Sequence, residues 1–206
     1  NINPVGRIFV FPNVGSYFGG DVITGILFAG LHSSEETAIL VDVGTNAEVV
    51  VGNQNWLIAC AGAAGPALEG GVTRMGMMAG SGVIDHVTIN RETKEFVLGT
   101  IDDESPRGIC GSGLIDLAAE LFRAGMINIQ GKLVPDACAH RLTERHGINH
   151  LMVLPAEKMA TGEGLTVSQA DLDSLIRSKA AMYTILETIT ESVGVTLNDL
   201  ASFYVA

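Results

Sequence analysis

The sequence predicts an α/β fold, and three observations lead to this class. Apolar residues make up 47% of the 206 residues, enough to bury one core, while aromatic residues make up only 5%. The 25 glycines suit close packing of helices on sheets better than a sandwich with an aromatic core. Short runs of branched residues also alternate with longer segments of helical spacing. We expect one domain or two closely packed lobes.

Short apolar runs predict most of the strands. Residues 38–43 form a run broken only by Asp42, which is typical of a central strand covered on both faces. Gly44 and Gly52 predict tight turns, so we expect an antiparallel meander over residues 38–60. A polar segment between two branched runs predicts a second hairpin further on. The expected strands are 7–12, 38–43, 47–51, 56–60, 83–89, 95–101, 150–154 and 203–206.

Two helices are predicted before the last third of the chain. Asp21 is placed to cap a buried helix over residues 22–31. A second helix begins at Gly111 and is expected to stop at Gly125. Residues 128–150 have no clear period and are expected to be a loop with short strands.

The longest predicted helix covers residues 168–192, where apolar side chains recur with a period of 3.6 residues. Thr166 or Ser168 is expected as its N-cap, with Gln169 or Asp171 closing a capping box. One side of this helix is therefore expected to face a sheet.

The formal charge of -11 excludes non-specific nucleic-acid binding, but a single nucleotide held by amides and Mg²⁺ needs no basic surface. Three widely spaced cysteines fit a reducing cytosol and exclude both a disulfide scaffold and a ferredoxin ligand set. The five histidines form no pair with helical metal-ligand spacing, so we do not expect a zinc site. We expect no membrane segment and no signal peptide, and therefore a cytoplasmic location.

The two ends of the sequence predict that it was cut from a longer chain. It starts at Asn1 without Met and stops at Ala206 inside an apolar run that we interpret as an unfinished buried strand.

The segment Asp42-Val43-Gly44-Thr45-Asn46 is the first candidate site. Glycine lets a backbone approach phosphate, the Thr45 hydroxyl and the amides can donate to phosphate oxygens, and Asp42 can orient Mg²⁺ or a water molecule. A tight β-turn in which Asp42 caps the turn is the competing interpretation.

Two further glycine-rich segments are candidates for close approach to a ligand. The first, residues 61–71, contains Gly62, Gly65 and Glu69, and a flexible loop is its alternative. The second is Gly111-Ser112-Gly113, which could present helix N-terminal amides to an anion or serve helix packing. It lacks the lysine of a P-loop. Cys110 beside it is either buried or a reactive thiol.

Lys179 is predicted to fall within the apolar stripe of the last helix. We hypothesise that it reaches a phosphate or an acidic partner, with snorkelling or a structural ion pair as alternatives.

Taken in order, these motifs resemble the iron–sulfur ATPases that reductively activate corrinoid proteins. The resemblance covers nearly the whole chain and rests on the ordered set of segments rather than on one of them. The segments that carry it are Tyr17-Phe18-Gly19-Gly20-Asp21, Val41 to Asn46, Ala61 to Gly71, Ile109 to Asp116 and Gln169 to Leu186.

The resemblance implies part of one actin-like nucleotide-binding domain over residues 1–206, with a mixed sheet and flanking helices as in actin, sugar kinases, Hsp70 and ribonuclease H. It implies ATP and Mg²⁺ as cofactors, Asp42 as the catalytic residue and Mg²⁺ ligand, and Asp21 as a further candidate Mg²⁺ ligand. The family's first phosphate hairpin and [2Fe-2S] domain are expected before Asn1, and its adenosine loop after Ala206. We therefore expect this piece alone to be inactive.

Three functions compete at this stage. The first is an ATPase domain that helps reduce the Co(II) state of a corrinoid-protein partner. The second is a non-catalytic scaffold of the same fold that docks a partner or forms a homodimer. A small-molecule kinase is the third and rests on fold analogy alone.

Overall fold

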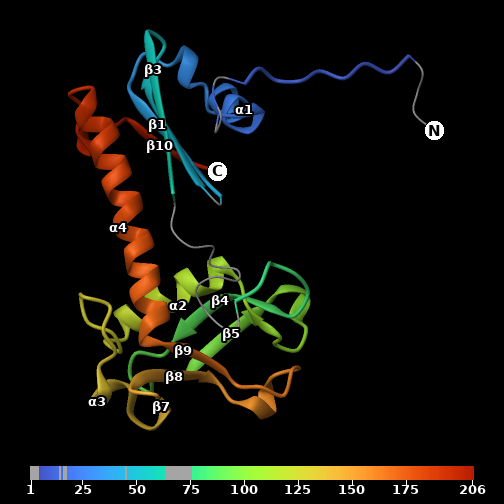
Figure 1. Cartoon of the computed structure of the whole chain (residues 1–206), viewed down its shortest axis with the longest axis vertical. Coiled ribbons are helices and arrows are strands. Elements are labelled where there is room, and N and C mark those ends of the chain that lie inside the picture. The colour runs from blue at the N-terminus through green and yellow to red at the C-terminus, as the bar shows by residue number, and fades with distance from the viewer. Residues whose placement is uncertain (1–4, 14, 16–17, 45, 64–75) are drawn as a thin grey trace. The chain divides into compact units, whose positions relative to one another are not determined.

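The computed structural model describes residues 5–13, 15, 18–44, 46–63 and 76–206 (Figure 1). The chain divides into two compact units. Unit 1 comprises Asn1–Ala64 and Ala180–Ala206, and unit 2 comprises Gly65–Lys179. Whether all 206 residues belong to one domain stays a prediction.

Unit 1 is built on one mixed sheet with the strand order β10-β1-β2-β3. Its strands are β1 (Ala38–Val43), β2 (Asn46–Asn53), β3 (Trp56–Ala63) and β10 (Ser202–Val205). β1 pairs in parallel with β10 and antiparallel with β2, which in turn pairs antiparallel with β3. The predicted antiparallel meander is therefore confirmed.

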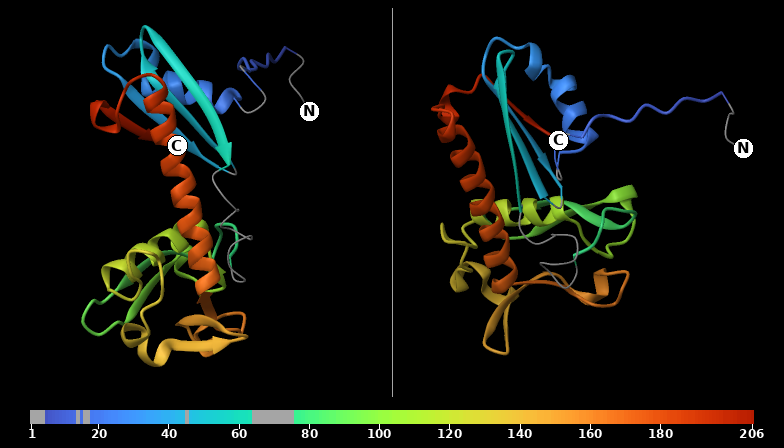
Figure 2. Two further views of the ribbon diagram at one scale, coloured as in Figure 1. Left: turned by 60° about the vertical axis from the view of Figure 1, so that its left-hand side comes forward. Right: turned by 45° about the horizontal axis from the view of Figure 1, so that its top comes forward.

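A helix covers each face of this sheet (Figure 2). On one face, Leu40 of β1 packs with Val22 of α1 (Gly20–Ala29). On the other face, Ile39 lies in a separate cluster with Ile189, which belongs to the C-terminal part of helix α4. Side chains that alternate along β1 thus fill two cores, and the prediction of a central strand covered on both faces is confirmed.

Three predictions at the margins of unit 1 need correction. Residues 7–12 form no strand, since they pair with no strand among the described residues and Ile8 is 92% exposed. The helix expected at 22–31 is present as α1 but is buried only at Val22, while Phe28 is 94% exposed. β10 forms as expected, but as an edge strand of the described sheet it leaves Val205 68% exposed.

Unit 2 contains a three-stranded sheet in the order β5-β4-β6, covered by helix α2 (Gly111–Arg123). β4 (Val83–Ile89) and β5 (Phe96–Thr100) form the predicted antiparallel hairpin, and β6 (Gly108–Ile109) pairs in parallel with β4. Gly125, with φ of 69°, follows the helix as predicted.

Carboxylates of α2 complete the hydrogen bonding of β4 where the short β6 ends. Asp116 Oδ2 accepts a bond from the Val87 N–H at 2.7 Å and lies 2.7 Å from Nδ1 of His86. Glu120 accepts a bond from the Ile89 N–H at 3.0 Å. These contacts fix the register of the helix on the strand, because they replace a missing neighbouring strand.

The second sheet of unit 2 has the order β7-β8-β9. Its strands are β7 (Leu142–Arg145), β8 (Ile148–Leu154) and β9 (Leu165–Ser168), and a short helix α3 (Pro135–Cys138) precedes them. The sequence patterns missed α3 and β9, since four residues are too few to display a period. Short 3-10 turns lie at Leu31–Ser33, Ile101–Asp103, Ala139–Arg141, Ala156–Lys158 and Leu197–Asp199.

Helix α4 (Gln169–Ser192) confirms the longest predicted helix. Ser168 caps it as expected, because the Ser168 N–H donates to Asp171 Oδ2 at 2.7 Å and the Asp171 N–H donates to the Ser168 hydroxyl at 3.2 Å. No helix in the described part of the chain combines the length and apolar character needed to cross a membrane.

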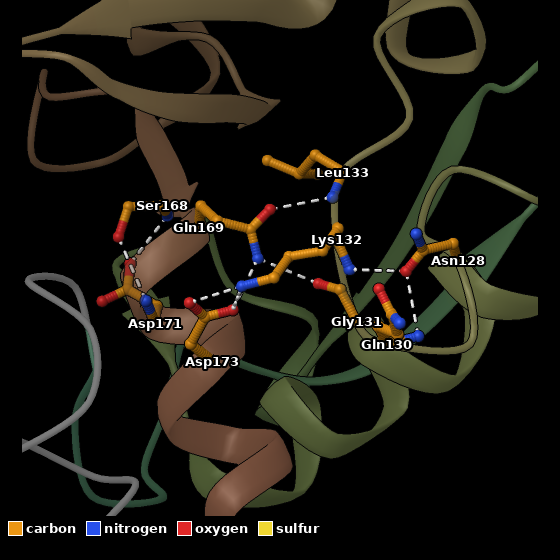
Figure 3. Close-up of polar contacts among 9 residues, drawn as sticks. All are labelled: Asn128, Gln130, Gly131, Lys132, Leu133, Ser168, Gln169, Asp171 and Asp173. Carbon is orange, nitrogen blue, oxygen red and sulfur yellow. Dashed lines mark hydrogen bonds and ion pairs between the residues drawn. The ribbon is translucent and has the colours of Figure 1, made fainter.

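A polar network ties the first turns of α4 to the loop after α2 (Figure 3). Lys132 Nζ lies 2.7 and 2.8 Å from the two carboxylate oxygens of Asp173. The Gln169 side chain accepts a bond from the Leu133 N–H and donates to the Gly131 carbonyl and to Asp173. The beginning of α4 is therefore held through both side chains and main chain.

Replacing Gly113 with alanine is expected to destabilise unit 2 by about 1–3 kcal/mol, as overpacking does in other cores. A Cβ at Gly113 would lie 2.4 Å from the Ile84 carbonyl oxygen, which is backbone and cannot move aside cheaply. Urea unfolding would measure the loss, with the exposed neighbour Ser112→Ala as the control within about 0.5 kcal/mol of the parent. Equal stability of G113A and the parent would contradict the packing role.

Lys132→Met is expected to lower the stability of unit 2 at neutral pH by about 0.5–1 kcal/mol, since the lysine is half-exposed. The Lys132 hydrogen bond, opposed by burial and assisted by Gln169, lowers the pKa of Asp173 below 3.8. The contribution is therefore present above pH 3.8 and disappears as pH falls through the lowered pKa. Denaturation at several pH values checks this, and Lys158→Met, at an exposed lysine, is the control.

Candidate functional site

Three carboxylates gather on the α1 face of the unit 1 sheet. Alternation along β1 places Asp42 on the same face as Leu40, and alternation along β2 places Glu48 on the same face as Val50, both of which pack toward α1. The β1–β2 register sets Asp42 directly opposite Glu48. Asp21 belongs to the first turn of α1.

The electrostatics of Glu48 confirm that the three groups interact. Burial raises the pKa of Glu48 above 4.5, and the negative charges of Asp42 and Asp21 raise it further. Like charges directly opposite on neighbouring strands destabilise a sheet. The face therefore concentrates negative charge that the described residues do not neutralise with a nearby cation.

The bend between β1 and β2 lies beside these carboxylates and faces solvent. Val43 is 50% exposed and Gly44 is exposed, so no side chains cover the bend. The Val43 N–H donates to the Ala206 carbonyl at 3.1 Å, and the Gly44 N–H donates to the Asn46 carbonyl at 2.8 Å. Donation by the Gly44 amide to a phosphate would require this bond to open. Thr45 lies outside the described residues.

Gly62 lies on the opposite face of the sheet from the carboxylates. It pairs with Ala47 across the strands, and a Cβ at this position would lie 2.6 Å from the Ile185 side chain of α4. The structure thus gives Gly62 a packing role, and its contact with a nucleotide stays a prediction. Gly65 and Glu69 lie outside the described residues.

Gly111, Ser112 and Gly113 belong to unit 2 and form the first turn of α2. The first recorded intrahelical bond runs from the Leu114 N–H to the Cys110 carbonyl at 3.0 Å, as at any helix start. Gly113 lies against backbone, which supports the packing alternative for that residue. Cys110 is buried, and its thiol donates to the Ile84 carbonyl, which confirms burial over reactivity.

Lys179, at the end of unit 2, is exposed. Within the part of the chain that the structure describes, no ion pair or hydrogen bond is recorded for its amine. Snorkelling accounts for this position, and contact with a phosphate stays a prediction.

The structure brings together Asp21, Asp42, Gly44 and Asn46 of the predicted site in unit 1, and adds Glu48. Sequence reasoning missed Glu48 because it stands within a branched run, although an acidic residue alternating with valines opposite Asp42 was a usable signal. Among the described residues, no group of three or more His, Cys, Asp or Glu side chains is arranged to hold a metal ion by itself.

Glu48→Gln is expected to stabilise unit 1 at neutral pH by less than about 1 kcal/mol, because it removes a charge that burial and two neighbouring carboxylates disfavour. The folded state holds the Glu48 proton more tightly than the unfolded state. Parental stability therefore falls as pH rises from 4.5 through the raised pKa, and the advantage of the variant vanishes below pH 4.5. Urea unfolding across this range, with the exposed Glu36→Gln as control, tests the sign.

Comparisons with known proteins agree with this architecture. A family model described as the C-terminal domain of RACo, the ASKHA domain, matches residues 36–206, and a model described as the RACo middle region matches residues 1–34. A solved structure titled reductive activator for corrinoid, iron–sulfur protein is 37% identical with a TM-score of 0.87 over 96% of this chain and 31% of that one.

Two curated relatives extend the similarity. The corrinoid activation enzyme RamQ of Eubacterium limosum is 32% identical over 212 residues, covering 100% of this chain and 35% of RamQ. The Co(II) methylated amine-specific corrinoid protein reductase of Methanosarcina barkeri is 25% identical over 220 residues, covering 97% of this chain and 37% of that protein. The chain thus spans about a third of the length of these relatives. On the family-model match and the agreement in fold, the chain belongs to the family of the RACo C-terminal ASKHA domain.

Proposed function

We propose that this chain is part of an ATP-dependent activator that returns a corrinoid protein from the Co(II) state by one-electron reduction. The observation that carries the proposal is the solvent-facing β1–β2 bend with Asp42 at its edge, in a chain of the RACo ASKHA family. The names of RamQ, the Methanosarcina barkeri reductase and the solved activator support a corrinoid protein as the partner.

The charge of unit 1 favours a nucleotide bound together with a divalent cation. Unit 1 contains eight aspartates and glutamates but only one basic residue among lysines and arginines, Arg7. Phosphate oxygens therefore need a cation other than unit 1 side chains beside this bend. Carboxylate oxygens of Asp42, Glu48 and Asp21 match the hard ligands that Mg²⁺ takes, usually one or two carboxylates plus phosphates and water.

In this proposal the residues of the bend divide the work. Asp42 holds Mg²⁺ or orients the attacking water, while the Thr45 hydroxyl and Asn46 donate hydrogen bonds to phosphate oxygens. Bound Mg²⁺ supplies charge neutralisation at the phosphoryl group. Gly62, Gly65, Glu69, the Gly111–Gly113 turn and Lys179 are kept as further candidate contacts with the nucleotide.

The electron needed for cobalt reduction must come from another part of the protein. The three cysteines in the described residues are free, and two of them, Cys110 and Cys138, are buried, so they do not form a cluster ligand set. A [2Fe-2S] cluster elsewhere in the full-length protein is the source that the family resemblance implies.

Asp42→Asn in the full-length protein is expected to lower ATP turnover by at least about tenfold, because it removes the charge that orients Mg²⁺ or water. Turnover would be measured with and without a corrinoid-protein partner, alongside the rate of Co(II) loss followed by its absorbance. Asp136→Asn, at an exposed carboxylate of unit 2, is the matched control and should leave both rates unchanged.

The same experiment separates the competing functions. Equal ATP turnover in D42N and the parent, with corrinoid reduction intact, would remove Asp42 from the mechanism and favour a docking scaffold. Turnover stimulated by a small hydroxylated substrate instead of the corrinoid protein would favour a kinase.

A further inference from the structure

Strand β3 is an unprotected sheet edge. It is the last strand of the order β10-β1-β2-β3, and no strand among the described residues pairs with its outer side. Its eight residues, Trp56–Ala63, include no charged residue and no proline. Its register with β2 runs without a bulge from Asn53 opposite Trp56 to Asn46 opposite Ala63. Natural edges are usually blunted by charges, prolines, bulges or short length, and β3 has none of these devices.

The other edge strands of the described residues differ from β3. The outer strands β5, β6, β7, β9 and β10 have two to five residues each. β7 also carries Glu144 and Arg145. The eight-residue length and neutral surface of β3 therefore set it apart as a pairing edge.

A cavity of about 350 Å³ lies along β3, between the strand and the C-terminal part of α4 in unit 1. Ile58, Cys60, Ile185 and Ile189 give it an apolar wall, and Thr184, Thr188 and Ser192 supply small hydroxyl groups. A strand added to the open edge of β3 would direct every second side chain toward this space.

We propose that β3 pairs with β3 of a second copy of this protein, antiparallel about a two-fold axis at Cys60. The size of the side chains along the strand supports this occupant. On the α4 face, large residues stand at one end, Trp56 and Ile58, and small ones at the other, Cys60 and Gly62. Two-fold pairing about Cys60 sets Ile58 opposite Gly62 of the second copy, so a large side chain meets a small one in both directions.

Charge favours the same edge. Unit 1 carries eight carboxylates against one arginine, so two copies repel each other over most of their surfaces. The neutral edge of β3 lets two such acidic bodies approach without placing like charges opposite each other. The paired sheets would form one continuous eight-stranded sheet from the two copies.

The other face of β3 offers the test. Leu57 is 41% exposed, Ala59 is exposed and Ala61 is half-buried, so longer side chains fit there in the monomer. Pairing about Cys60 sets Ala59 opposite Ala61 of the second copy. Ala59→Lys with Ala61→Lys therefore places two like-charge pairs across the interface, and Ala59→Glu with Ala61→Glu does the same with negative charge.

Sedimentation equilibrium of the full-length protein should show a dimer for the parent and at least tenfold weaker association for each double variant alone. An equimolar mixture of the lysine and glutamate variants should recover dimers, because every cross-strand pair is then of opposite charge. This recovery also shows that both variants are folded. Ala119→Lys, at an exposed alanine on α2, is the matched control and should associate like the parent.

Hydrogen exchange places the effect on the strand itself. The amides of β3 should gain protection as the parent is concentrated, and the double variants should lose this gain. A monomeric parent at about 100 μM, dimers that tolerate both double variants, or a mixture that fails to associate would each overturn the proposal.

Discussion

The burial of β1 on both faces is the constraint on which unit 1 depends. Leu40 and its neighbours on one face pack against α1, while Ile39 and Val41 pack against α4 on the other. A strand held in this way cannot shift by one residue without turning both sets of side chains toward the wrong core. The register therefore fixes which face Asp42 occupies at the end of the strand, and the same register sets Glu48 opposite it.

Helix α4 extends the same constraint to a second set of contacts. Its first turns are anchored in unit 2 by Ser168, Gln169 and the Lys132–Asp173 ion pair, and Leu172 lies in the unit 2 core. Its later turns place Met182, Ile185 and Ile189 on the unit 1 sheet. One continuous helix thus contributes to two cores. Changes in its first turns affect unit 2, and changes after Ala180 affect the sheet that carries the bend.

The sequence predicted best those elements whose pattern repeats often enough to be read. The run at 38–43, the capping box at Ser168 and Asp171 and the hairpin between β4 and β5 were all expected and are present. Residues 7–12 were misassigned because branched residues favour a strand while the ladder partner that makes one is a tertiary feature. Glu48 was missed for a related reason, since its importance depends on the residue across the strand.

The acidic face near the bend also explains why the candidate site carries an electrostatic cost. Glu48 is partly buried opposite Asp42 and near Asp21, and its raised pKa records repulsion that a serine or valine in its place would avoid. Such a cost is commonly retained where the charge has a use, and a divalent cation bridging carboxylates and phosphate oxygens would convert the repulsion into attraction. A bend with only one basic side chain in its whole unit therefore fits phosphate bound through a metal better than phosphate bound through lysine or arginine.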